Sequence, residues 1–266
     1  MKPKLTPRLA VAAALMLSAC GGSPLNPEAG AEVGKPPDVV VPSAEVAVLM
    51  MGNSHTSANA LPRQLENMLE GRFPGRTVAV VEAPNWLFLD ERLADPMSRA
   101  LLRSRPWLAV VLQAQKYSSS GAYHYSTAAA EEWVQEVRKV QALPVLFPEW
   151  PRRGVNETAR IYDLHVSIAR KQAACVAPIG QAWDLSLTRH PALTLHARDG
   201  NHSAMAGAHL AALMLYTTIT GASPLGLPTL PKLSGLDSTV QSQLRQVAAD
   251  TAQSVAPRLH CPEDKT

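Results

Sequence analysis

Cysteine is scarce in this sequence of 266 residues, which has only Cys20, Cys175 and Cys261. No two of them have the close spacing of a metal-binding motif, and none has neighbours typical of an activated thiol. The sequence thus argues against a cysteine-based zinc site and a cysteine nucleophile. Cys175 and Cys261 are either a disulfide pair or two buried free thiols, since the sequence gives no Cα separation.

The sequence also lacks an excess of charge once its first 19 residues are set apart. The formal net charge is +3, and Lys2, Lys4 and Arg8 supply three of the 25 basic residues. The rest of the chain has 22 basic and 22 acidic residues. Such a balance gives no electrostatic reason to expect nucleic acid as a partner, or broad attraction to an anionic surface.

Residues 1–19 have the pattern of an export signal, with a basic start, an apolar stretch too short to span a bilayer, and small residues at the end. They lead into Leu17-Ser18-Ala19-Cys20-Gly21, which resembles a bacterial lipobox. The alternative is an ordinary secretory signal cleaved after Ala19. Both predict an exported protein, and the lipobox predicts a lipid on Cys20 that anchors the chain to the cell envelope, on the periplasmic or surface face of the outer membrane.

The remaining chain divides by composition. Residues 20–43 are rich in Gly, Pro, Ala and Glu and predict a flexible tether. We expect one folded domain over residues 44–225, which is long enough to bury a sizeable core. Residues 226–266 predict a C-terminal helix and tail packed on that domain.

Short apolar runs alternate with helical patterns along the domain. Strands are predicted at 46–51, 77–81, 108–112, 144–147 and 176–179, and helices at 61–69, 90–102, 127–141, 156–173, 203–219 and 238–255. This alternation predicts an α/β fold in three layers, with a five-stranded parallel sheet between two layers of helices. Ligands of such sheets bind beyond the carboxyl ends of the strands, so residues that directly follow a strand are the first candidates for a site.

Ser54 directly follows the first predicted strand, within Gly52-Asn53-Ser54-His55-Thr56. At this turn a hydroxyl is placed as a nucleophile would be, beside the N–H groups of a helix start. The alternative is a helix N-cap, for which Ser, Thr and Asn are all preferred.

A second polar group precedes the alanine-rich helix, in Asp199-Gly200-Asn201-His202. A serine hydroxyl needs a base to remove its proton, and a neutral imidazole suits that role near neutral pH. Asp199 would accept the other ring N–H of His202 and fix its tautomer. Two alternatives are a polar loop that caps the next helix, and a metal site formed by His196, Asp199 and His202.

Taken together, these two segments resemble the SGNH, or GDSL-like, hydrolase superfamily over roughly residues 46–224. Ser54 in G-N-S-H-T matches the nucleophile of the more common G-D-S motif, and Asp199 and His202 match the D-x-x-H motif. The G-x-S-x-G elbow of other α/β hydrolases is absent from the sequence. The resemblance implies a flavodoxin-like SGNH fold, a Ser-His-Asp triad and no metal or organic cofactor.

The resemblance also implies an oxyanion hole formed by three groups. The first is the N–H of Ser54. The family's glycine after strand two is missing, and Asn85 is its best replacement because Asn tolerates positive φ, although a simple turn Asn is equally compatible. The family's amide after strand three corresponds in spacing to Gln115, with Gln113 as its rival and a buried structural amide as the alternative.

Aromatic residues after the third and fourth strands complete the predicted site. Trp150 and Tyr117 are candidates for a substrate wall, or else they cover the sheet edge. The predicted activity is hydrolysis of carboxylic esters, either small esters or O-acetyl groups on a glycan, through an acyl-enzyme. With only three Phe, the chain does not suggest a lipase. The alternative is a non-catalytic surface lipoprotein that binds glycans or small molecules with the same fold.

Overall fold

The computed structural model describes residues 42–230 and 236–265. The predicted signal segment, Cys20 and residues 20–41 of the predicted tether lie outside this part of the chain. Within it, no helix has the length and apolar character needed to cross a membrane.

A five-stranded parallel sheet forms the centre of the molecule, in the strand order β2-β1-β3-β4-β5. The strands are β1 Val46–Met51, β2 Val78–Glu82, β3 Ala109–Leu112, β4 Leu143–Leu146 and β5 Cys175–Val176. β1, β3 and β4 are buried along their whole length, because helices cover both faces of the sheet and leave no side for polar residues. The predicted α/β fold with a five-stranded parallel sheet is confirmed.

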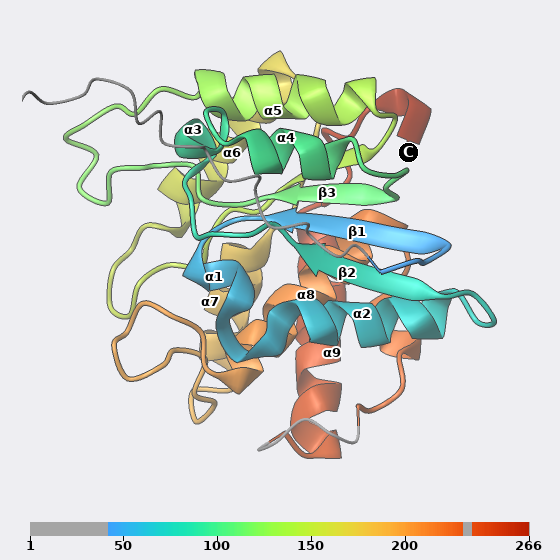
Figure 1. Ribbon diagram of the computed structural model, residues 1–266. Coiled ribbons are helices and arrows are strands. Elements are labelled where there is room, and N and C mark those ends of the chain that lie inside the picture. The colour runs from blue at the N-terminus through green and yellow to red at the C-terminus, as the bar shows by residue number, and fades with distance from the viewer. Residues whose placement is uncertain (1–41, 231–235, 266) are drawn as a thin grey trace, which may run out of the picture. The chain divides into compact units, whose positions relative to one another are not determined.

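Two layers of helices sandwich this sheet, with α3 to α6 above it and α2, α7, α8 and α9 below it in the view of Figure 1. Successive residues of β1 point to opposite faces, so Val48 and Met50 join the core below the sheet and Leu49 and Met51 the core above. The helices are α1 Ser54–Ser57, α2 Leu61–Arg72, α3 Leu89–Arg92, α4 Pro96–Leu102, α5 Ala128–Lys139, α6 Thr158–Lys171, α7 Ile179–Arg189, α8 Met205–Thr220 and α9 Ser238–Ser254.

The helix α8 is buried on nearly every side, which explains why its sequence is apolar all round. Its neighbours are α2, α7 and α9. The C-terminal helix α9 therefore packs on the domain and completes the cover of α8.

Two of the predicted elements differ clearly from those in the structure. The predicted helix 90–102 is two helices, because the Asp95 side chain caps α4 at Met97 and Ser98 while Pro96 occupies its first turn. The predicted strand 176–179 ends at Val176, and Ile179 instead begins α7, a helix that was not predicted.

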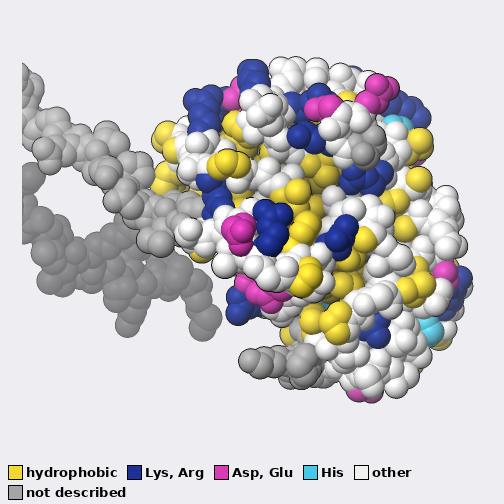
Figure 2. Space-filling model, turned by 90° about the vertical axis from the view of Figure 1, so that its right-hand side faces the viewer, with side chains coloured by type: hydrophobic (Ala, Val, Ile, Leu, Met, Phe, Trp, Pro, Cys, Tyr) yellow, Lys and Arg dark blue, Asp and Glu magenta, His cyan; other side chains and the backbone are white. Residues whose placement is uncertain are grey.

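Figure 2 shows the molecule from the right-hand side of Figure 1. On this face Lys and Arg side chains occur at several separate places, with Asp and Glu beside some of them. The face therefore carries no continuous patch of one sign.

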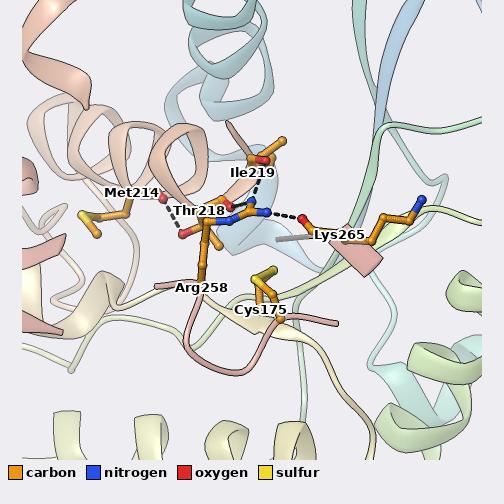
Figure 3. The surroundings of a disulfide bond; sticks show 7 residues. Cys175, Met214, Thr218, Ile219, Arg258 and Lys265 are labelled. Atoms are coloured by element: carbon orange, nitrogen blue, oxygen red, sulfur yellow. Dashed lines mark hydrogen bonds between the residues drawn. A yellow bond between two sulfur atoms is a disulfide. The ribbon is translucent and has the colours of Figure 1, made fainter. Parts of the chain in front are cut away.

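Cys175 and Cys261 form a disulfide that joins β5 to the C-terminal tail. Arg258 fastens the same tail, since its guanidinium donates to the carbonyl oxygens of Thr218, Ile219 and Lys265 (Figure 3). The tail is thus fixed to both β5 and the end of α8.

Removal of this disulfide is expected to lower the free energy of unfolding by about 2–4 kcal/mol, because the bond closes a long loop that the unfolded chain would otherwise explore freely. The two cysteines are 86 residues apart in sequence. Urea unfolding of the Cys175→Ala/Cys261→Ala variant measures the effect, with the parent under reducing conditions as the control. Equal stability of oxidised parent and variant would contradict the expectation.

Candidate active site

The loops after β1, β3 and β4 and the loop before α8 meet at one edge of the sheet, at the left of Figure 1. Because all strands are parallel, their carboxyl ends lie together at this edge. A cleft of about 760 Å³ opens here. Its lining includes Ser54, Asp199 and His202 together with His55, Gln115, Tyr117, Glu149 and Arg152.

Ser54, His202 and Asp199 form a continuous hydrogen-bonded chain. Ser54 Oγ lies 2.8 Å from His202 Nε2, and His202 Nδ1 lies 2.6 Å from Asp199 Oδ2. The hydrogen bond from His202, aided by backbone N–H groups, lowers the pKa of Asp199 to about 2. The carboxylate is therefore ionised near neutral pH, as needed to orient an imidazole and to stabilise its charged form.

The capping alternatives do not describe these residues. The N-cap of α1 is Asn53, whose side chain accepts the N–H of His55, so the Ser54 hydroxyl is not used as a cap. Helix α8 has Ala204 as its N-cap and no side-chain cap. Asp199 accepts the N–H groups of Asn201 and His202 within its own loop.

The residues of the metal alternative have other partners in the structure. His196 Nε2 lies 2.7 Å from the carbonyl oxygen of Pro151, so this ring is committed to the backbone. Over residues 42–230 and 236–265, no group of three or more His, Cys, Asp or Glu is arranged to hold a metal ion.

A tight turn holds Asp199 and His202 at this spacing. His196 and Ser203 pair as an antiparallel bridge, and the N–H of Ala197 donates to the carbonyl of His202. Gly200 has a φ of 72°, a conformation that side chains disfavour. The turn thereby places the Asp199 carboxylate against Nδ1 of His202, whose Nε2 faces Ser54 Oγ.

Asn85, the predicted replacement for the glycine after strand two, has a φ of 63°, which lies in the left-handed region that glycine adopts readily. Its residue type explains this, since Asn is among the few residues that enter the left-handed region readily. The carbonyls of Asn85 and Gly52 both accept from Nη2 of Arg92, at 2.7 and 2.6 Å. The turn of Asn85 therefore lies beside the turn that carries Ser54.

Arg92 is a functional candidate that the sequence analysis missed. Its side chain is fully buried, and Nη1 also donates to the Pro84 carbonyl and to Ser98 Oγ. One guanidinium thus links the turn after β1 to the turn after β2. No motif marks it, because an Arg within a helical pattern ordinarily faces solvent.

The two glutamines after β3 have different surroundings from those predicted. Gln115 lines the cleft, but its Nε2 donates to the carbonyls of Lys116 and Ser126, at 2.8 and 3.1 Å. A flipped amide would place its oxygen against both carbonyls, so this orientation is determined by its partners. The prediction that Gln115 donates to an oxyanion is therefore not supported.

Gln113, its rival, is fully buried. Its Oε1 accepts the N–H of Asn53 at 2.8 Å, and its Nε2 donates to Glu149 Oε1 at 2.6 Å. A Cβ at Gly52 would lie 2.5 Å from the same Oε1, so glycine is required there for close approach. Gln113 thus supports the turn after β1 that carries Ser54, through its hydrogen bond to the N–H of Asn53.

Trp150 is not a substrate wall, because only 1% of its surface is exposed. Its indole N–H donates to the Asn201 carbonyl at 2.8 Å, and its ring stacks on Trp183. It therefore supports the loop that carries His202. Tyr117 does line the cleft, with its hydroxyl 3.4 Å from Glu157.

His55, the residue after Ser54, is a further functional candidate at this site. It is buried, and its ring stacks on that of His202 with centroids 4.9 Å apart and also contacts Trp150. Burial, followed by the nearby charge of His202, lowers the pKa of His55 to about 4. Near neutral pH the His55 ring is therefore uncharged, and the imidazole of His202 packs against it.

Comparison with known proteins gives a fold but no established family. No family model matches this sequence, and no curated protein is significantly similar to it. A DUF4886 family protein from Bacteroides uniformis matches 78% of this chain and 95% of its own, with 17% identity and a TM-score of 0.63.

Two other solved structures are also similar. One is a protein from Slackia heliotrinireducens provisionally described as an SGNH hydrolase, with 26% identity, a TM-score of 0.49, and coverage of 64% of this chain and 97% of its own. The other is a lipase/acylhydrolase from Enterococcus faecalis, with 14% identity, a TM-score of 0.49, and coverage of 66% and 96%.

Proposed function

We propose that this protein is a serine-dependent ester hydrolase that uses Ser54, His202 and Asp199 as its catalytic triad. The observation that carries the proposal is the unbroken hydrogen-bonded chain from Ser54 Oγ through both ring nitrogens of His202 to the Asp199 carboxylate. This is the arrangement that activates a serine hydroxyl, and the N-cap of the following helix is Asn53, not Ser54.

In the proposed reaction Ser54 Oγ attacks the acyl carbonyl while His202 Nε2 takes its proton. The same proton then passes to the leaving alcohol, and water, activated by His202, releases the acyl group from Ser54. The backbone N–H groups of Ser54 and Asn85 are the proposed oxyanion donors, supported by the first-turn position of Ser54 and the left-handed turn at Asn85. The reaction requires neither a metal nor an organic cofactor.

The proposed substrates are small carboxylic esters or O-acetyl esters of glycans. The cleft is lined by hydroxyl, amide and charged side chains as well as aromatic rings, which suits a polar alcohol part better than a long lipid chain. We further propose that the protein is exported and held at the cell envelope by a lipid on Cys20, which would bring the cleft to esters outside the cytoplasm.

Labelling of the full-length chain with a fluorophosphonate probe tests the proposal, because the probe reacts with activated serines. We expect the parent to label and the Ser54→Ala variant not to label. Ser57→Ala is the matched control, since Ser57 lies on the same helix but its hydroxyl donates to Glu82. A folded parent that fails to label would favour the alternative of a non-catalytic binding protein.

A further inference from the structure

Three neighbouring strand ends are linked by side chains beneath the nucleophile turn. Asn53 follows β1, Gln113 follows β3 and Glu149 follows β4, and these strands are adjacent in the sheet. The N–H of Asn53 donates to Gln113 Oε1 at 2.8 Å, and Gln113 Nε2 donates to Glu149 Oε1 at 2.6 Å. The chain of hydrogen bonds thus runs across the carboxyl edge of the sheet and ends one residue before Ser54.

We propose that Gln113 and Glu149 act as positioning residues for Ser54, with Glu149 orienting the amide of Gln113 and Gln113 holding the N–H of Asn53. This inference rests on the proposed hydrolase function and adds two positioning residues to the proposed active site. Neither residue needs to touch the substrate in this role.

The direction of each hydrogen bond follows from its partners. An amide side chain has one acceptor oxygen and one donor nitrogen, and a backbone N–H can only donate. Asn53 therefore requires the oxygen of Gln113, which leaves the nitrogen facing Glu149. An acceptor at position 149 keeps the amide from rotating, and full burial of Gln113 makes the loss of either partner costly.

The carboxyl of Glu149 is enclosed by other charged groups. Burial raises its pKa to about 7, and Glu157 acts in the same direction, while the hydrogen bond from Gln113 and the charges of Arg152 and His202 act against it. Below its pKa the carboxyl is neutral and above it ionised, but an oxygen remains to accept from Gln113 in both forms. The proposed role therefore requires an acceptor at this position and not a negative charge.

The position of Ser54 matters because small displacements of a nucleophile are costly. A misplacement of about 1 Å from the productive geometry can reduce a rate by about 100-fold. Without its acceptor, the half-buried N–H of Asn53 would lose its partner in the protein, and the turn would move to find a new one. We call the two hydrogen bonds from Glu149 through Gln113 to the N–H of Asn53 the relay. Loss of the relay should thus lower the reactivity of Ser54 while the fold persists.

The rate constant for fluorophosphonate labelling of the full-length chain tests this role. We expect Glu149→Ala and Gln113→Met each to lower it by about 10- to 100-fold. Glu149→Gln should restore a rate close to that of the parent, because its amide oxygen supplies the same acceptor. The double variant Gln113→Met/Glu149→Ala should be no slower than the slower single variant, since the two residues act as a unit.

Matched controls separate positioning from a general loss of stability. Gln241 is a fully buried amide in α9 that bonds to Leu230 and Leu236, and Glu136 is a buried carboxyl on α5. Gln241→Met and Glu136→Ala should lower the urea midpoint without lowering the labelling rate constant. A parent-like rate in Glu149→Ala would overturn the proposal. So would a rate in Glu149→Gln as low as that in Glu149→Ala, which would indicate a role for the charge.

Hydrogen exchange at the amide of Asn53 tests the relay independently of catalysis. We expect this N–H to be protected in the parent and in Glu149→Gln, and to exchange faster in Gln113→Met. Equal protection in all three would overturn the relay even if Ser54 reacts with the probe. A parent that is protected but does not label would instead contradict the proposed hydrolase function and leave the relay intact.

Discussion

Replacement of Ser54 by alanine is expected to reduce ester hydrolysis by about 10⁴-fold or more, to the level that substrate binding and the oxyanion donors alone provide. The reason is that the proposed reaction forms a covalent bond at Ser54 Oγ, and in the described part of the chain no other hydroxyl is hydrogen-bonded to His202 Nε2. Initial rates with p-nitrophenyl acetate measure the effect in the full-length chain.

His202→Ala is expected to cause a loss of similar size, because without its base the Ser54 hydroxyl keeps its proton. The double variant Ser54→Ala/His202→Ala should be no less active than either single variant, since residues that act as a unit do not have additive effects. The catalytic roles assigned to Ser54 and His202 would be contradicted if the rate loss of the double variant equalled the product of the two single losses. An unchanged rate in His202→Ala would contradict them as well. Ser57→Ala again serves as the matched control.

Arg92→Met is expected to lower the free energy of unfolding by about 2–5 kcal/mol, the cost of leaving two buried and two half-buried acceptors without donors. The guanidinium serves the carbonyls of Gly52, Pro84 and Asn85 as well as Ser98. Urea unfolding of the variant measures the change. Because two of these carbonyls belong to the turns of Ser54 and Asn85, labelling by the fluorophosphonate probe should fall as well.

Arg99→Met is the control for this prediction. Arg99 lies on α4, and its guanidinium pairs at the surface with Glu132, a kind of contact that contributes about 1 kcal/mol or less. Arg92→Lys should be intermediate, because an ammonium group is compact and does not reach all the acceptors of a planar guanidinium. Equal stability of Arg92→Met and Arg99→Met would show that the buried guanidinium does not join the two turns as we infer.

Local patterns in the sequence were sufficient for most of the fold. The run Val46 to Met51 is apolar at every position, which indicates a strand covered on both faces, and it is β1. Helix α7, Ile179–Arg189, was not predicted because it begins soon after the two-residue strand β5. A short apolar run in the sequence does not distinguish the end of a strand from the start of a helix.

The three proposed triad residues were also identifiable from the sequence. Ser54 directly follows a strand, and Asp199 and His202 have the spacing of a known motif, so each had a local signal. No local signal in the sequence distinguished Gln113 from Gln115. The choice between them depends on which carbonyls, amides and carboxylates surround each side chain, and Ser126 and Glu149 reach those positions only when the chain folds.

Hydrophobic periodicity and turn residues are local properties, so they were enough to predict the strands, the parallel sheet and the edge at which the candidate site lies. The buried roles of Arg92, His55 and Trp150 and the partners of Gln113 became visible only in the folded chain. These roles arise from contacts between segments far apart in the chain, and burial changes what a polar side chain must do. An Arg or Gln that would face water on an isolated helix or turn must satisfy every donor and acceptor once it is enclosed.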